Sequence, residues 1–291
     1  MTVLKTTADT PSSAMTQQPP RRSRWRGRRW PLNMLLLVIS LITVTPFFLM
    51  VILALSPADS AGIPQQLPER LTLDNISRML GASGFIRWTI NTIIYSVVSV
   101  VIVLLAAAMA GYAFARKRFP GRQVLMWSFL ATLMVPVQAM IIPYFVLISN
   151  LEGVNTYWGL IVPTLANAQA VFLMRQFIRD LPEELFEAAK VDGAPEWRVF
   201  FQLVLPLTKP VLATLGIFVF LWHWNDFLWP LVVAQSDDMR TLTVGLATLR
   251  TADVSTPELM AGATISVIPC IIVFFVLQRY LVNSIAMTGI K

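Results

Sequence analysis

From Trp88 to Tyr112 the chain reads WTINTIIYSVVSVVIVLLAAAMAGY, and no residue in this stretch carries a formal charge. A helix needs roughly 20 apolar residues to cross a hydrocarbon layer about 30 Å thick. A strand of a transmembrane barrel would instead alternate apolar and polar residues over about 10 positions. The stretch therefore predicts a membrane-spanning helix, whose backbone hydrogen bonds are all satisfied within the segment.

Five further apolar stretches predict an all-α polytopic membrane protein with six transmembrane helices. Their estimated bounds are Leu32–Leu55, Val124–Ile148, Tyr157–Met174, Pro210–Trp229 and Met260–Leu277. The 291-residue chain as a whole is 56% hydrophobic and 13% charged, with a mean hydropathy of +0.65, which lies outside the range of ordinary soluble domains. The first stretch is longer than the apolar region of a cleavable signal peptide, so we interpret it as a retained anchor.

The distribution of basic residues predicts the orientation of these spans. Of the 23 Lys and Arg residues, most lie in the N-terminal tail, between spans two and three, between spans four and five, and after span six. The positive-inside rule then places both termini and the segment 180–206 in the cytoplasm. We expect a disordered basic tail over 1–31 and a transmembrane domain over 32–291, with its core at 88–282. Beside a span, the arginines of the tail indicate orientation and attraction to anionic lipid rather than binding to nucleic acid.

A charged segment, EAAKVDGAPEWRVFFQLVLP from Glu187 to Pro206, separates spans four and five. Pro182 suits the first turn of a helix, and Gly193 is the residue type that ends one in a left-handed conformation. A second short helix is expected from Pro195, with an apolar stripe, until Leu205-Pro206 breaks it before span five. Physical reasoning alone leaves two readings: a helix that docks in a groove of another protein, or two helices that lie on the bilayer.

The spacing within this segment resembles the signature of the permeases of ATP-binding-cassette (ABC) importers. That signature is Glu-Ala-Ala, three residues, Gly, nine residues, an aliphatic residue, one residue and Leu-Pro; it appears here as Glu187, Ala188, Ala189, Gly193, Leu203, Leu205 and Pro206. The stretches YAFARKRFPGR from Tyr112, DGAPEWRVF from Asp192 and WNDFLWPL from Trp224 resemble the MalG-like, carbohydrate-importing branch. The resemblance covers the chain from about Leu32 to Lys291.

The resemblance implies the type I ABC importer architecture, in which the chain is one permease of a pair in the cytoplasmic membrane. A second similar permease, two cytoplasmic ATPase subunits that bind ATP and Mg²⁺, and an extracytoplasmic solute-binding protein would be its partners. The segment 180–206 would hold the coupling helix, whose contact residues would be Glu187, Ala188, Ala189, Asp192, Gly193 and Pro206. The expected function is import of a carbohydrate or related polyol by alternating access. The alternatives are a non-sugar solute such as a polyol phosphate or, less favoured, a secondary transporter.

A second polar cluster lies near the outer end of span five, at Trp222, Trp224, Asn225 and Asp226. Asp226 is the only acidic residue within the estimated spans, and ionisable groups at membrane depth are often functional. Aromatic rings beside Asn and Asp suit a sugar, so these four residues are candidates for a solute path or gate. Interfacial anchoring and a structural pairing of Asp226 are the competing readings. His223 is expected to be packed and hydrogen-bonded.

The sequence lacks the motifs of several catalytic classes. It contains no GxxxxGK[ST] phosphate-binding loop, so ATP hydrolysis is assigned to partner subunits. With one His and one Cys, it has no zinc-binding or Ser/His/acid pattern, and we expect no catalytic residue, metal site or cofactor in this chain. A secondary transporter would need coupling-ion carboxylates within the spans, whereas this chain has one acid near a membrane edge.

Overall fold

The computed structural model describes residues 30–57, 68, 70–250 and 254–288, and side chains as far as Arg279. The regular elements within these ranges are all helices. The chain divides into two compact units, Met1–Phe48 and Leu49–Lys291, which are described separately. The predicted disordered tail over 1–31 lies outside the described residues, apart from its last two positions, which begin the first helix. The extreme C-terminus, 289–291, also lies outside them.

Helix α1 (Trp30–Ala54) corresponds to the first predicted span and is apolar on all sides. Both of its threonine hydroxyls are satisfied within the helix, since Thr43 and Thr45 donate to the carbonyls of Ile39 and Leu41. Its large apolar side chains are exposed, and a surface of this kind is stable in hydrocarbon rather than in water. At 25 residues it is long enough to cross a bilayer.

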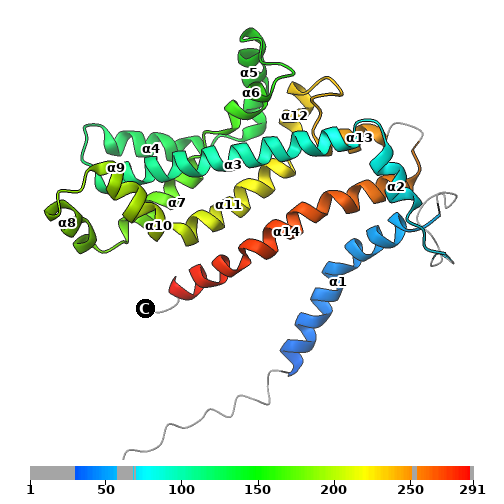
Figure 1. Cartoon of the computed structure of the whole chain (residues 1–291), viewed down its shortest axis with the longest axis horizontal. Helices are drawn as coiled ribbons and strands as arrows, with labels where there is room; N and C mark the ends of the chain where they lie inside the picture. Colours follow the sequence, from blue (N-terminus) through cyan, green and yellow to red (C-terminus); the bar gives the residue numbers. More distant parts are fainter. Residues whose placement is uncertain (1–29, 58–67, 69, 251–253, 289–291) are drawn as a thin grey trace, which may run out of the picture. The chain divides into compact units, whose positions relative to one another are not determined.

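Four helices form the body of the second unit. They are α3 (Phe85–Arg116), α7 (Ala168–Arg179), α11 (Lys209–Trp224) and α14 (Thr256–Thr288), which lie alongside one another in Figure 1. Helix α3 packs against both α7 and α11, and α11 also packs against α14. Helix α3 approaches α7 closely at Gly111, where a Cβ would lie 2.7 Å from Met174 Cβ. The small residues Ala107 and Gly111, four positions apart, therefore serve packing within the bundle.

Three helices are long and apolar enough to span a membrane by themselves, and three bent helix pairs raise the number to as many as six within the described residues. The pair α4 (Arg122–Thr132) and α5 (Val137–Asn150) bends by 102°. Pro136 lies at this bend in an extended conformation that a helix interior cannot contain. The sequence predicted six spans, and the structure agrees with that number, but the third span is sharply broken rather than kinked.

The other two bends have different local causes. Helix α6 (Tyr157–Ile161) runs into the short 3₁₀ turn η2 (Val162–Thr164) and then meets α7 at 49°. Asn167 produces this break, because its side chain accepts a hydrogen bond from Ala170 N and so begins α7 anew. The segment before α11 meets it at 74°, with Thr208 between them.

The segment 180–206 contains the two predicted short helices. Helix α8 (Glu183–Val191) begins after Pro182 and is followed by Gly193 at φ +65°, as expected. The second runs without interruption through α9 (Glu196–Arg198), the π-helix η3 (Val199–Val204) and α10 (Leu205–Leu207). The prediction that Leu205-Pro206 ends this helix is wrong. Pro206 lies within this run, shortly after the π-helix η3, and the helix ends only at Thr208.

The region between the fifth and sixth predicted spans is partly helical and packed. It contains α12 (Leu228–Val233) and α13 (Leu242–Leu249), and the start of α3 holds the turn between them. Asn91 Nδ2 donates to the carbonyls of Asp238 and Arg240, each at 2.8 Å. Helix α2 (Asp74–Gly81) packs beside this region, against α3 and α14. This end of the second unit is therefore fixed by hydrogen bonds.

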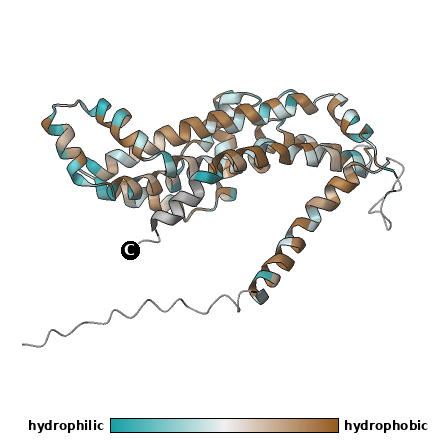
Figure 2. Cartoon of the chain, turned by 60° about the horizontal axis from the view of Figure 1, so that its bottom comes forward, coloured by the Kyte–Doolittle hydropathy of each residue, from teal (hydrophilic) through white to brown (hydrophobic). Residues whose placement is uncertain are grey.

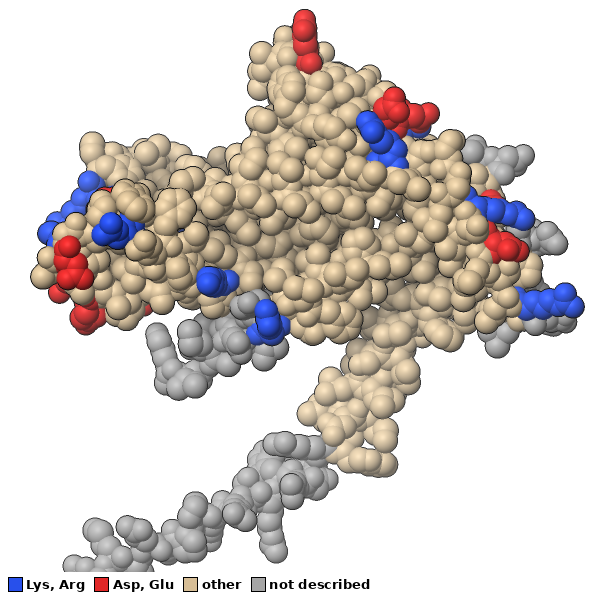
Figure 3. All heavy atoms as spheres, in the orientation of Figure 1, with Lys and Arg blue, Asp and Glu red and all other residues tan. Residues whose placement is uncertain are grey.

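Charge and hydropathy divide along the second unit in the way that a membrane protein requires. Figure 2 shows apolar residues along the long helices and hydrophilic residues concentrated around α8 and α9. On the face drawn in Figure 3, Lys, Arg, Asp and Glu lie mostly near the two ends, with a few more on the upward projection and along the lower edge, and the centre of this face is free of charge. An uncharged belt between two polar ends is what a hydrocarbon layer selects.

Candidate functional site

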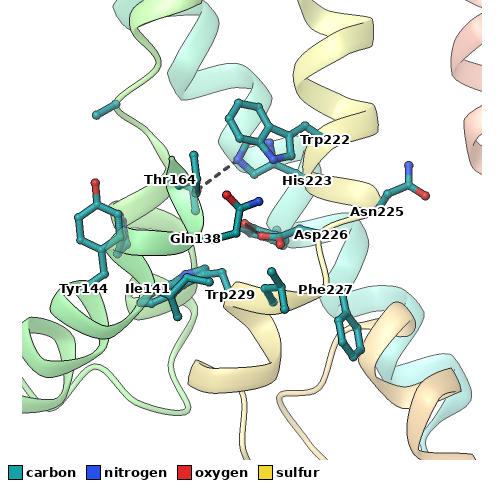
Figure 4. Close-up of a pocket in the computed structure, with 15 residues that line it drawn as sticks. Gln138, Ile141, Tyr144, Thr164, Trp222, His223, Asn225, Asp226, Phe227 and Trp229 are labelled. Atoms are coloured by element: carbon teal, nitrogen blue, oxygen red, sulfur yellow. Dashed lines mark hydrogen bonds between the residues drawn. The ribbon is translucent and has the colours of Figure 1, made fainter. Parts of the chain in front are cut away.

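A cavity of about 510 Å³ opens where α11 ends and α12 begins. Residues from α3, α5, η2 and the α11–α12 connection surround it (Figure 4). Its walls are formed by Tyr95, Val137, Gln138, Ile141, Tyr144, Pro163, Thr164, Ala166, Trp222, His223, Asn225, Asp226, Phe227, Leu228 and Trp229. Most of this lining is apolar or aromatic, with a few polar groups, which is typical of small-molecule sites.

Asp226 is the only charged residue in the lining, and the protein itself uses much of its hydrogen-bonding capacity. The Tyr95 hydroxyl donates to Asp226 Oδ2 at 2.8 Å, and the backbone amides of Phe227 and Trp229 also donate to the carboxylate. The Thr243 hydroxyl donates to the backbone carbonyl of Asp226 at 2.7 Å. Asp226 therefore joins α3, α12 and α13 at one wall of the cavity.

Two further predicted residues, Trp222 and Asn225, line this cavity with Asp226. The Trp222 side chain is accessible, with 53% of the residue exposed. Asn225 is also exposed, and its Nδ2 donates to the Leu221 carbonyl at 2.8 Å within its own helix. The Asn225 side-chain oxygen remains available as an acceptor toward a solute.

The fourth predicted residue, Trp224, does not face the cavity, and its assignment to a solute path is corrected here. It is only 2% exposed and stacks on Phe220, with ring centroids 5.4 Å apart. Its indole Nε1 donates to the Ser266 carbonyl of α14 at 3.0 Å. Trp224 is thus a packing residue between α11 and α14.

His223 is packed and hydrogen-bonded, as the sequence predicted. Its Nδ1 lies 2.7 Å from the Val219 carbonyl, and its Nε2 lies 3.2 Å from the Thr164 hydroxyl. The Tyr95 ring meets the imidazole edge-on at a centroid distance of 5.0 Å. These contacts hold the wall of the cavity between α3, η2 and α11.

The lining residues that the sequence did not identify include Gln138, Tyr144 and Trp229. Gln138 lies in the first turn of α5, directly after the break at Pro136. It is the only amide side chain in the third predicted span, a signal that could have identified it. The Tyr144 and Trp229 rings meet edge-on at 6.2 Å, and Trp229 Nε1 donates to the Leu160 carbonyl.

The second candidate site is the exposed helix α8 with the turn that follows it. Glu187, Ala188, Asp192 and Gly193 are exposed on this segment, whereas Ala189 packs partly against the core. A Cβ at Gly193 would meet nothing within 4 Å, so the surface beside the turn is open. Pro206 is also exposed but belongs to the separate helical run through α10. The structure thus brings five of the predicted coupling residues together in one segment.

The end of α8 exposes an apolar residue as well. Val191 is 87% exposed, directly before the turn at Asp192 and Gly193. A short helix that combines acidic, small and apolar exposed residues has the surface of a docking element. Among the described residues, no group of three or more His, Cys, Asp or Glu side chains is placed to hold a metal ion.

Comparison with known proteins connects both sites to one family. Residues 102–287 match the family model of the binding-protein-dependent transport system inner membrane component. The chain is 38% identical over 268 residues to the arabinooligosaccharides transport system permease protein AraQ of Halalkalibacterium halodurans, covering 90% of this chain and 96% of that protein. It is 33% identical to the diacetylchitobiose uptake system permease protein NgcG of Streptomyces coelicolor, covering 87% and 85% of the two chains.

A solved structure shares the fold over nearly the whole chain. A crystal structure of a bacterial ABC transporter involved in the import of the acidic polysaccharide alginate aligns with a TM-score of 0.76 at 27% identity, covering 90% of this chain and 99% of that chain. The matched family region includes the C-terminal part of α3 from residue 102, all of α8 and the α11–α12 connection. The chain is a multi-pass membrane protein that belongs to the family of binding-protein-dependent transport system inner membrane components, the permeases of ABC importers.

Proposed function

We propose that the chain is the translocation subunit of an importer that carries a neutral oligosaccharide or related polyol across the cytoplasmic membrane by alternating access. The observation that carries this proposal is α8, an exposed helix that ends at Gly193 and bears the Glu-Ala-Ala signature. The chain has no phosphate-binding loop of its own, so its energy source must be another subunit.

The assembly follows from the same reasoning. Two ATPase subunits drive the permease pair, and one of them docks at α8 of this chain through Glu187, Ala188, Ala189, Asp192 and Gly193, with Pro206 supporting the following helix. A second similar permease completes the translocation path, and a solute-binding protein delivers the solute from outside. Both termini and the segment 180–206 are cytoplasmic, because the basic residues concentrate on that side. The tail covers 1–31 and the permease domain 32–291.

The cavity at the end of α11 supports a neutral solute. Its lining contains one carboxylate and no Lys or Arg, so a phosphate or uronate would gain no ion pair there and would be repelled by Asp226. Trp222 offers a ring face for a pyranose or furanose, and Asn225 and Gln138 offer hydrogen bonds to hydroxyl groups. The relatives named for arabinooligosaccharides and diacetylchitobiose agree with this class of solute.

The position of Asp226 suggests a gate in addition to a contact. Its carboxylate connects Tyr95 of α3 to the start of α12, so a shift between α3 and α11 would break one of these bonds and open the cavity wall. Movements of packed helices between two discrete arrangements are a common basis for alternating access. In this proposal Trp222, Asn225 and Asp226 line the solute path.

ATP-dependent uptake tests the proposed function. The chain would be purified with its co-encoded partner subunits, reconstituted in vesicles and supplied with the cognate binding protein outside. We expect internal ATP to drive uptake of at least one of three radiolabelled probes: arabinotriose, maltotriose or diacetylchitobiose. Uptake of these probes by the chain alone, driven by an ion gradient without ATP, would contradict the proposal.

A competition experiment tests the class of solute. Excess glycerol 3-phosphate or an alginate trisaccharide is expected to leave uptake of the neutral probe unchanged, whereas unlabelled neutral oligosaccharide competes. In the Asp226→Asn variant, uptake of the neutral probe should fall, because the new amide nitrogen cannot accept hydrogen bonds from Tyr95 or the backbone amides. Transport of an anionic probe by the unaltered protein would exclude the neutral-solute assignment.

A further inference from the structure

The cytoplasmic end of α3 carries three side chains that hold the segment on both sides of α8. Arg116 contacts the chain before α8, and Tyr112 and Lys117 contact the chain after it. None of these three residues belongs to the Glu-Ala-Ala signature, and they lie about 70 residues earlier in the sequence. We refer to Tyr112, Arg116 and Lys117 together as the α3 clamp.

Arg116 holds the upstream side. Its Nη2 donates to the carbonyls of Ile178 at 3.0 Å and Leu181 at 2.5 Å. These carbonyls lie at the end of α7 and in the linker to α8, where a helix leaves acceptors unsatisfied. The Arg116 guanidinium also lies over the Phe186 ring in α8, 4.1 Å from the ring centre. One planar cation therefore connects α3, the end of α7 and α8 itself.

Tyr112 and Lys117 hold the downstream side at a single carboxylate. The Tyr112 hydroxyl donates to Glu196 Oε2 at 2.8 Å, and Lys117 Nζ forms an ion pair with Glu196 Oε1. An exposed ion pair by itself contributes little stability. Tyr112, however, is only 9% exposed, and its ring packs on Phe200 of η3. The hydrogen bond from Tyr112 to Glu196 is therefore supported by a buried aromatic contact.

Between these two attachments, the exposed surface of α8 is free for a partner. Glu187, Val191 and Gly193 lie between the Arg116 contacts and Glu196, and all three are exposed. Helix α3 also packs tightly against α7 at Gly111, the residue directly before Tyr112 of the clamp. A displacement of α8 is therefore transmitted to α3 through these two sets of side-chain contacts, as well as through the covalent connection of α8 to α7, which packs on α3.

We infer that the α3 clamp transmits the movement of α8 to α3, so that the cavity wall at Tyr95, on the same helix, follows the ATPase subunits. This inference rests on the proposed function, because it requires α8 to be the element that the ATPases move. The clamp residues act by positioning α8 and do not touch solute or nucleotide. The clamp stays closed throughout the transport cycle, so that α3, α7 and α8 move as one body.

The coupling ratio, solute imported per ATP hydrolysed, tests this inference in the reconstituted transporter with a neutral probe that it carries. In Arg116→Ala the ratio should fall about fivefold or more while ATP hydrolysis stimulated by the loaded binding protein persists. Arg118→Ala, which removes the same charge from an exposed side chain two residues away, should keep the wild-type ratio. A wild-type ratio in Arg116→Ala would overturn the inference.

A cross-linking experiment decides the matter if Arg116→Ala does not assemble. Lys117→Cys and Glu196→Cys, combined with Cys270→Ala to remove the native thiol, break the ion pair and lower the ratio. Joining the two new thiols with a short bifunctional reagent should restore it, because the clamp is then closed permanently. Loss of uptake on joining, reversed by a cleavable reagent, would show that α8 must separate from α3 and would contradict the inference.

The two proposals fail in different ways. If the unaltered transporter shows no ATP-dependent uptake, the proposed function is wrong and the clamp has no role to test. A different result would overturn only the inference about the clamp. In that case the unaltered transporter couples normally and Gly193→Asp abolishes uptake, but the clamp variants behave as wild type.

Discussion

Two neighbouring tryptophans at the end of α11 have different surroundings. Trp222 is 53% exposed beside the cavity, whereas Trp224 is 2% exposed and bonded to the Ser266 carbonyl. Successive residues on a helix point about 100° apart, so two positions that are close in sequence face nearly opposite directions. A sequence pattern that groups the aromatic residues cannot separate these two roles.

The two positions should respond differently to truncation. Trp224→Ala removes a stacked, hydrogen-bonded core residue and should lower the free energy of unfolding by on the order of 3 kcal/mol. Trp222→Ala should leave the melting temperature in detergent nearly unchanged but weaken uptake of the neutral probe. Thermal unfolding and uptake measured on the same preparations would check both. A stable Trp224→Ala protein together with an unstable Trp222→Ala protein would reverse the assignment.

Asp226 shows how far single residues could be predicted. Its rarity as an acid within the spans identified it from the sequence, and the structure places it in a cavity wall. Its partners Tyr95 and Thr243 could not be inferred, because contacts between α3, α12 and α13 depend on the tertiary arrangement. Gln138 was missed for the same reason, since the break at Pro136 turns it toward the cavity.

At the scale of elements, the packing of α3 on α7 depends on a single hydrogen atom at Gly111. A methyl group there would lie 2.7 Å from Met174 Cβ and 2.9 Å from the backbone nitrogen of Arg175. Gly111→Ala should therefore force the helices apart, at a cost of about 1–3 kcal/mol in the free energy of unfolding. Gly81→Ala is the matched control, because a Cβ there meets nothing within 4 Å. Equal stability of the two variants would refute this account of the contact.

Hydrogen bonds at the other end of α3 hold the turn before α13. Asn91→Leu removes the donors to the Asp238 and Arg240 carbonyls and the acceptor of the Tyr157 hydroxyl, whose bond is 2.6 Å. Hydrogen exchange in the turn should become faster, because two partly buried carbonyls lose their partners and the turn opens more readily. Tyr157→Phe, which removes one of the three bonds, should give an intermediate rate. Unchanged exchange in Asn91→Leu would mean that packing alone fixes the turn.

The elements differ in how well the sequence predicted them. Helices α3 and α8 were predicted with nearly correct ends. A long apolar run identifies α3, and Pro182 and Gly193 mark the two ends of α8, so local sequence rules are sufficient for both helices. The 102° break between α4 and α5 was not predicted, because a proline indicates a kink without fixing its angle. The end of this helix was also misplaced, since the helix continues past Pro206, which follows the π-helix η3, as far as Thr208.

At the scale of the whole molecule, α3 contacts both functional regions of the second unit. Its first turns bind the turn before α13, Tyr95 reaches Asp226 at the cavity, and the α3 clamp holds the segment around α8. A single helix of 32 residues therefore connects the cavity to the segment around α8. The proposed function requires such a connection, because in it the energy is released in another subunit.

The most direct test of the account is uptake of a neutral probe by the reconstituted transporter carrying Gly193→Asp. The account predicts that binding of the probe by the solute-binding protein and assembly of the subunits persist, whereas ATP-driven uptake is lost, because a charged side chain then occupies the open docking surface. Gly121→Asp is the control, since Gly121 also has a positive φ, +77°, and open space around it but lies outside α8. Wild-type uptake by Gly193→Asp, or equal loss in Gly121→Asp, would contradict the claim that α8 is where ATP hydrolysis drives this permease.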